Sequence, residues 1–229
     1  MKKIFAIVSF AALMMTASVS SQARDGIFNF GIKAGLNFTN MSGLKDFGQQ
    51  DFLKTYTGFN AGMVFNFNLP LGFELNPEVL YVQSGQRTKD YEFNIPWTDQ
   101  EVNVKGGSFK TGAIRVPINV QWGIGLFNDF IKPYVVVSPY VGAVLFGNGS
   151  ILDVDFDSES VNSYLNRFQY GIGVGAGIYI WNFQVSFKWN WDLNPAFKDN
   201  GSFTEAVGDA IKAGNKKFNG GELSIAYFF

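Results

Sequence analysis

Strict alternation of apolar residues with polar or small ones runs through eight separate segments of the chain. In each segment the apolar phase contains no Asp, Glu, Lys or Arg, although charged residues make up 16% of the sequence. A period of two is typical of β-strands, whose successive side chains point to opposite faces of a sheet. The chain is therefore predicted to be all-β, with strands at 28–38, 59–69, 73–81, 114–124, 131–145, 168–180, 183–193 and 223–229.

The polar phase indicates which face meets water. A soluble sheet carries Lys and Glu on its outer face, whereas here the polar phase holds Asn, Gly, Ser and Gln with a few charges of both signs. An apolar exterior around a polar interior is typical of membrane barrels, as are aromatic residues near strand ends. The aromatic residues in such positions are Tyr81, Trp122, Trp181, Trp189, Trp191 and Tyr227.

The connections between the predicted strands alternate in length. Three are short, at 70–72, 126–130 and 181–182, and four are long and polar, at about 39–57, 85–110, 147–166 and 194–220. Outer-membrane barrels have short periplasmic turns and longer extracellular loops. We therefore expect an eight-stranded antiparallel up-and-down transmembrane β-barrel, with short periplasmic turns, four long extracellular loops and both chain ends on the short-turn side.

The first 23 residues, MKKIFAIVSFAALMMTASVSSQA, have the layout of a secretory signal peptide. Two lysines precede an apolar run that is too short to cross a bilayer as a helix, and small residues follow it. A buried N-terminal helix is the alternative. The interpretation as a signal predicts cleavage between Ala23 and Arg24, a barrel domain at 24–229, and residence in the outer membrane of a Gram-negative cell.

Two residue types are missing from the chain, which contains no Cys and no His. Their absence excludes disulfides, thiol nucleophiles, Ser-His-Asp catalysis and histidine metal sites. Lys and Arg number 18 against 19 Asp and Glu, a balance that does not favour nucleic-acid binding. We expect no enzyme, no cofactor and no metal.

Glycine occupies every second position of the stretch GIGVGAGIY, at Gly171, Gly173, Gly175 and Gly177. A nucleotide-binding loop would instead read G-x-G-x-x-G and open a helix, whereas Trp181-Asn182 and another strand follow here. The glycine row is therefore expected to face the interior of a narrow barrel. There it would leave room for Tyr134, Tyr140, Tyr179 or Arg115.

Charged residues of the polar phase are expected to form an interior network. They could line a conducting channel, but the favoured interpretation is a salt-bridged plug, because unpaired charges are costly away from water. The expected members, with Arg167 at a rim, are Lys33, Glu74, Glu78, Arg115, Lys132, Arg167, Lys188, Asp192 and Glu222.

Two local features complicate this pattern. Proline cannot donate to a strand ladder, so local irregularity is expected at some of the prolines inside the strands. These are Pro77, Pro117, Pro133 and Pro139. In the last long connection, residues 203–212 have the pattern of a short amphipathic helix.

Two strand motifs resemble the PorT-like outer-membrane β-barrel family. The segment PEVLYVQSG at 77–85 is similar to that family's P-E-L-L-Y-S-Q-K-G, and IRVPINVQW at 114–122 is similar to its L-E-I-P-L-L-L-K-Y. Arg115 stands where an acid is common. Lys132-Pro133-Tyr134, the glycine row and the final Tyr227-Phe228-Phe229 also fit.

The resemblance implies a small barrel whose terminal Phe229 is recognised by the barrel-assembly machinery. The family's namesake takes part in protein secretion through the outer membrane. The favoured function is a non-enzymatic membrane barrel, structural or binding, which contacts outer-membrane lipid, acts through its long loops and has an unidentified envelope or secretion partner. One alternative is an outer-membrane enzyme that modifies lipid or peptide, with a pair such as Glu74 and Glu78 in acid–base roles. The other is a soluble ligand-binding barrel of lipocalin type.

Overall fold

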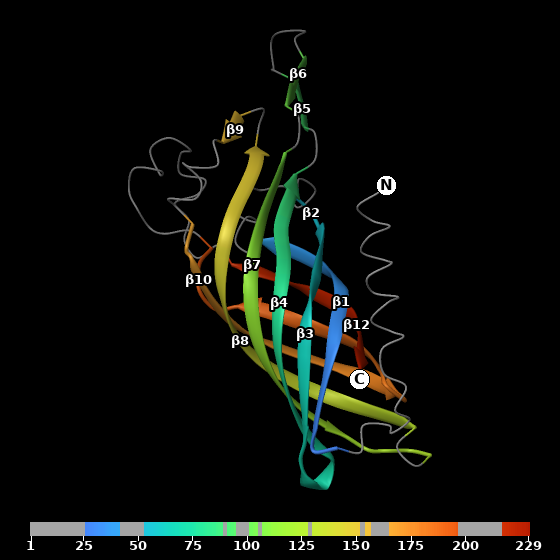
Figure 1. The fold of residues 1–229 in the computed structure, drawn as a ribbon. Coiled ribbons are helices and arrows are strands. Elements are labelled where there is room, and N and C mark those ends of the chain that lie inside the picture. Colours follow the sequence, from blue (N-terminus) through green and yellow to red (C-terminus); the bar gives the residue numbers. More distant parts are fainter. Residues whose placement is uncertain are drawn as a thin grey trace, which may run out of the picture.

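A computed structural model describes residues 26–41, 53–88, 91–94, 101–104, 107–127, 130–151, 154–156, 165–196 and 217–229. Within these ranges the chain is almost entirely β-structure (Figure 1). The predicted cleavage site at Ala23 and Arg24 and the predicted helix at 203–212 lie outside the described residues. No helix in the described part of the chain is long and apolar enough to cross a membrane.

Eight long strands form one closed antiparallel sheet. Each pairs with its neighbour among the long strands, β8 with β10 included, and one further ladder, between β12 and β1, closes the ring. The predicted eight-stranded up-and-down barrel is therefore confirmed. The strands are β1 (Phe28–Met41), β3 (Tyr56–Asn68), β4 (Phe73–Thr88), β7 (Ser108–Gly123), β8 (Ile131–Ile151), β10 (Phe168–Ile180), β11 (Phe183–Asp192) and β12 (Phe218–Phe228).

Short and long connections lie at opposite ends of the barrel, as predicted. We call the end that holds the 3-10 turn Pro70–Gly72, residues 126–127 and residues 181–182 the short-turn end, and the opposite end the long-loop end. β1 starts and β12 finishes at the short-turn end, where Gly31 pairs with Phe228. Four minor strands belong to the long connections: β2 (Leu53–Lys54), β5 (Tyr91–Asn94), β6 (Glu101–Val104) and β9 (Val154–Phe156).

Several strands reach further toward the long-loop end than the alternation predicted (Figure 1). β4 continues to Thr88 and β7 begins at Ser108, so this long connection is shorter than the expected 85–110. The alternation did not extend to these residues because the two faces of the strands no longer differ in polarity there. Val82 and Phe109, for example, are apolar residues buried inside the barrel. The β7–β8 register also shifts between Gly112 and Ala113, which breaks the period of two.

Three of the four strand prolines coincide with gaps in a ladder. Pairing skips beside Pro77 between β3 and β4, beside Pro117 between β4 and β7, and beside Pro139 between β7 and β8. The register is unchanged across each gap, so no residue is inserted, and Pro133 causes no gap against β10. The expected local irregularity is therefore confirmed at three sites.

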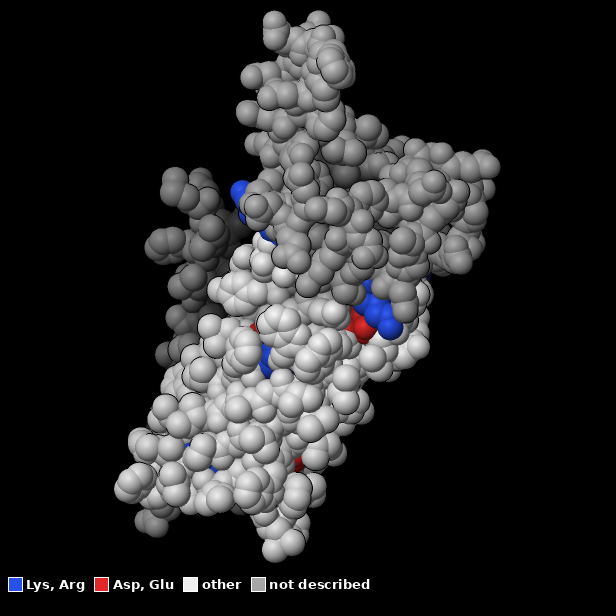
Figure 2. Space-filling view, turned by 180° about the vertical axis from the view of Figure 1, so that it is seen from behind, with Lys and Arg blue, Asp and Glu red and all other residues white. Residues whose placement is uncertain are grey.

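The outer wall is apolar. Its outward side chains are exposed hydrophobics such as Phe59, Ile118, Val137 and Phe187. Figure 2 shows a nearly uncharged wall, with charged atoms mainly toward the long-loop end. Soluble monomers rarely expose large apolar residues contiguously in this way. The interior is polar and charged, which excludes the lipocalin-type alternative, whose interior would be apolar.

Candidate functional site

The inward side chains of the barrel bring together eight of the nine charged residues predicted for the interior. Seven are buried, and Lys132 is half-buried. They form three groups at different depths, and in each group cations contact carboxylates. Because opposite charges are adjacent, the desolvation cost of burying each one is offset by its partners.

The largest group, which we call the central charge cluster, consists of Lys33, Glu78, Lys188 and Glu222. The Lys33 ammonium lies 2.9 Å from a Glu78 carboxylate oxygen and 3.0 Å from one of Glu222. Lys188 lies 3.3 Å from Glu222 and 3.7 Å from Glu78. Cations and anions therefore alternate around a ring built from β1, β4, β11 and β12, and their charges cancel.

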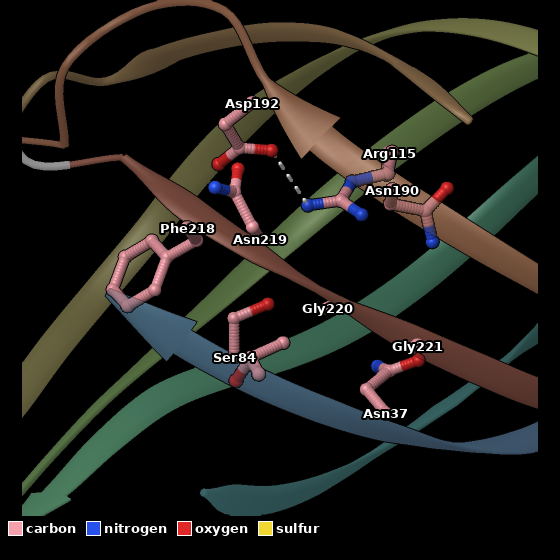
Figure 3. Close-up of a pocket in the computed structure, with 10 residues that line it drawn as sticks. Asn37, Ser84, Arg115, Asn190, Asp192, Phe218, Asn219, Gly220 and Gly221 are labelled. Carbon is pink, nitrogen blue, oxygen red and sulfur yellow. Dashed lines mark ion pairs between the residues drawn. The ribbon is translucent and has the colours of Figure 1, made fainter. Parts of the chain in front are cut away.

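A second group lies nearer the long-loop end, around Asp192. The Arg115 guanidinium is 3.6 Å from the Asp192 carboxylate and lies over the Tyr140 ring, 4.4 Å from its centre. The Tyr140 hydroxyl donates to Asp192 at 2.5 Å, and the Gln169 amide donates to it at 3.4 Å. Figure 3 shows the ion pair above a small pocket that is also lined by Asn37, Ser84 and Asn190. The pocket has room for no more than about one water molecule.

The third group is a single ion pair near the short-turn end, where the Lys132 ammonium lies 2.6 Å from a Glu74 oxygen. Arg167 joins none of the three groups, so its predicted membership of the interior network is wrong, whereas its expected place at a rim agrees with the structure. It is exposed at the long-loop end, just before β10 begins. Its guanidinium donates to the backbone carbonyls of Val144 and Leu145 at 3.2 and 2.7 Å, which fixes the β10 rim to β8.

The glycine row of β10 faces inward and receives side chains from neighbouring strands. A Cβ atom at Gly171 would collide with the Tyr140 hydroxyl, and one at Gly177 would collide with the Tyr134 hydroxyl. The predicted room for these two tyrosines is therefore confirmed. Tyr179 lies on β10 itself, and its ring packs on Tyr134 at 5.0 Å between centres.

The glycine row provides a graded test of this packing. A Cβ at Gly175 would collide with the Phe187 carbonyl oxygen and lie 2.8 Å from the Lys188 Cα, and neither backbone atom can move without opening the β10–β11 ladder. We expect Gly175→Ala to lower the free energy of unfolding by about 1–3 kcal/mol. At Gly173 the close neighbour is the Asn190 side chain, which can rotate away, so Gly173→Ala should cost less than about 1 kcal/mol. Urea titration measures both, and equal costs would contradict close packing at Gly175.

Two apolar layers lie on either side of the central charge cluster and the group around Asp192. Near the short-turn end, Tyr179 packs against Phe228 and Tyr134. At the long-loop end, buried apolar residues from strands and connections meet inside the mouth of the barrel: Phe109, Ala113, Val144, Leu165, Ala196 and Phe218. Leu165 and Ala196 lie outside any strand, so periodicity could not have identified them. We call this second layer the mouth plug.

Little space remains between these layers in the described part of the barrel. Around the central charge cluster, next to Asn119, Tyr134 and Ser186, there is no space for a water molecule. We expect the protein in planar bilayers to show at most small, unstable conductance, as an eight-stranded barrel holds little besides its own side chains. Steady porin-sized channels would contradict this packing and would require a wider wall.

The interior offers little for chemistry. In the described part of the chain no group of three or more potential ligand side chains could hold a metal ion. Glu74 and Glu78, the carboxylates considered for acid–base catalysis, contact Lys132 and Lys33 respectively and are buried. The predicted assembly signal, Phe229, follows β12 at the short-turn end, where its backbone N–H donates to the Phe30 carbonyl at 2.9 Å.

Comparison with known sequences identifies one family. A family model described as the outer membrane protein beta-barrel domain matches residues 20–198, which is more than half of the chain. Comparison with curated proteins finds no significant match.

Solved structures similar to this chain include three bacterial proteins. Neisserial surface protein A is 13% identical, with a TM-score of 0.44, over 89% of this chain and 98% of its own. The attachment invasion locus protein Ail of Yersinia pestis, in complex with the heparin analogue sucrose octasulfate, is 15% identical, with a TM-score of 0.42, over 89% of this chain and 100% of its own. OprG of Pseudomonas aeruginosa is 10% identical, with a TM-score of 0.40, over 88% of this chain and 94% of its own.

Proposed function

The chain belongs to the family of outer membrane protein beta-barrel domains, and we propose that it is a non-enzymatic barrel that binds a partner through its extracellular loops. The observation that carries this proposal is the filled interior. Among the described residues, paired charges, tyrosines and the mouth plug occupy the space inside the wall, which leaves no room there for a substrate or a passing solute. Contact with anything outside the membrane then falls to the four long connections.

The orientation follows from the unequal connections. Outer-membrane barrels place short turns in the periplasm and long loops outside the cell, which assigns the long-loop end to the exterior. The enzyme alternative would need an accessible, unpaired acid or base, whereas each carboxylate of the described interior contacts a cation. We therefore favour binding over catalysis.

The chain lacks cysteine, so single engineered thiols allow a clean test of orientation. Ser108→Cys, exposed at the long-loop end, should react in intact cells with a maleimide that cannot cross membranes. Leu71→Cys, in the short turn and 88% exposed, should react only after the outer membrane is permeabilised. The reverse pattern would overturn the assignment.

The partner is tested with a photocrosslinking residue at the same two positions. Position 108 should give a discrete crosslinked species by mass spectrometry, and position 71 should not give that species. If position 108 gives only lipid and barrel self-adducts, the binding function fails and a structural role remains.

A closer relation to PorT-like barrels, and with it a role beside protein secretion, is the finer proposal. It is supported by the two motifs at 77–85 and 114–122, which occupy the adjacent strands β4 and β7. Deleting the gene should then reduce the amount of exported protein in the medium while leaving periplasmic proteins in place. Unchanged secretion would reject this finer role and leave the barrel assignment intact.

Export by a cleaved signal peptide is also part of the proposal. We expect the mature protein to begin at Arg24, because Ser21 and Ala23 are the small residues that a signal peptidase requires before its cleavage point. Intact-mass analysis of outer-membrane fractions checks this directly. A mature form that keeps Lys2 and Lys3 would contradict this expectation.

Recognition of Phe229 by the assembly machinery has its own test. Phe229→Ala should lower the yield of barrel inserted in the outer membrane.

A further inference from the structure

Exposed cations gather on the outer face of the barrel at its long-loop end. Lys54, Arg87 and Lys110 come from the neighbouring strands β2, β4 and β7, and all three are exposed. Among residues whose side chains the structure describes, every side-chain carboxylate is buried inside the barrel. The outer face of these strands therefore presents positive charge without a described acid beside it. We call these three residues the cation triad.

The backbone holds the triad together. Lys54 pairs directly with Arg87 across the β2–β4 ladder, so both side chains lie on the same face. Lys110 pairs with Gly85, two residues from Arg87, and is therefore its diagonal neighbour. The buried Gln86 amide donates to the carbonyls of Lys54 and Arg87 at 2.9 and 2.8 Å, which ties β2 to β4 at this point. Like charges placed opposite each other destabilise a sheet, so this arrangement favours a bound anion.

The depth of the triad matches lipid headgroups. Phe146 and the Tyr81 hydroxyl cover the outer face of Gly112, and the Tyr81 ring packs on Phe59 at 5.5 Å between centres. Aromatic residues of this kind mark the membrane interface. Lys110 is two residues beyond Gly112 along β7, or about 7 Å nearer the exterior. The cation triad therefore lies just outside the level of the aromatic residues Phe59, Tyr81 and Phe146.

We propose that the cation triad binds the phosphate groups of anionic lipids in the outer leaflet. Arg87 can hold a phosphate through two parallel N–H donors, and Lys54 and Lys110 supply point charges on either side. The apolar wall below the triad accommodates the acyl chains of the same lipid. This inference rests on the outer-membrane placement proposed above and adds a lipid class to it.

The test measures binding of a fluorescent phosphatidic acid to the purified barrel in neutral detergent micelles, with the matching diacylglycerol as the lipid without phosphate. We expect the wild type to prefer phosphatidic acid. Each cation contributes about fivefold, so Arg87→Gln should weaken binding about fivefold and the triple variant Lys54→Gln, Arg87→Gln, Lys110→Gln about a hundredfold. Arg87→Lys, which keeps the charge and loses the paired donors, should fall between wild type and Arg87→Gln.

Arg167→Gln is the matched control, since it removes one exposed cation at the same end whose donors already bind backbone carbonyls. It should change binding less than twofold. Equal binding of the two lipids, or equal losses in Arg167→Gln and Arg87→Gln, would overturn the proposal. Heat-dependent gel mobility verifies that each variant is folded, and the single variants decide the question if the triple variant does not fold. Maleimide labelling from outside the cell tests the outer-membrane placement independently. A failure of the lipid-binding proposal can therefore be distinguished from a failure of the placement.

Discussion

Replacing Glu222 with Gln is expected to lower the free energy of unfolding by about 3–5 kcal/mol, the cost of removing one partner from a buried ion pair. Glu222 is 3% exposed and accepts contacts from Lys33 at 3.0 Å and Lys188 at 3.3 Å. The substitution keeps the side-chain volume but leaves two ammonium groups with one carboxylate, Glu78. The loss is therefore electrostatic rather than a loss of packing.

Urea titration of the barrel in detergent micelles measures this loss, and a second substitution identifies its cause. Adding Lys188→Met to Glu222→Gln restores a neutral cluster, so the double variant should be less destabilised than the sum of the two single variants. Ser224→Ala, one inward position along β12, removes a 2.8 Å hydrogen bond with Ser186 and should cost only about 1 kcal/mol. If Glu222→Gln costs no more than this control, the central charge cluster is hydrated and the plug interpretation fails.

The barrel could be predicted from the sequence because each strand has its own contrast between two faces. In β11, for example, Phe183, Val185 and Phe187 alternate with Gln184 and Ser186, and this local pattern sets the direction of every side chain. Short connections then require neighbouring strands to pair. These two local properties predict the strands and three hairpins, and the alternation of short turns with long loops then favours a closed barrel.

The partners inside the barrel could not be predicted in the same way. Lys33 on β1 contacts Glu78 on β4, with β3 lying between them in the sheet, so the contact depends on the curvature and register of three strands. Lys188 and Glu222 do lie directly opposite each other on adjacent strands, but the register follows a long connection of uninformative length. Composition showed that the charges balance, and only the structure shows which of them pair.

The same limit applies at the mouth of the barrel. Phe109 and Val144 are inward residues at positions where the period of two predicts polar ones, and Leu165 arrives from a connection. The mouth plug needs contributions from several parts of the chain at once, so no local window contains it. Arg167 lies at a rim as expected, but its partners could not be predicted, because a cation near a strand end can bond to rim carbonyls instead of joining the interior network.

Ile118→Arg is expected to destabilise the barrel in bilayers by about 2–4 kcal/mol, the cost of a guanidinium at the membrane midplane on the lipid side of a barrel. Ile118 is 46% exposed on the outer face of β7. It lies midway between Ile114, which pairs with Tyr81, and Trp122, whose indole donates to the Leu71 carbonyl. These two aromatic residues mark the two interfaces, so position 118 is close to the centre of the apolar band.

The adjacent Asn119 provides the matched comparison, since it faces inward and is 1% exposed. Its amide donates to the Asn76 carbonyl at 3.0 Å and accepts from Lys188 at 3.3 Å. Asn119→Ser should therefore cost about 1 kcal/mol in any solvent, whereas the cost of Ile118→Arg should fall when the bilayer is replaced by a short-chain detergent that lets water reach the wall. A photoreactive probe dissolved in the bilayer should label wild-type Ile118 and leave Asn119 unlabelled. Labelling of Asn119 with protection of Ile118 would reverse the two faces, and with them the membrane placement of the whole wall.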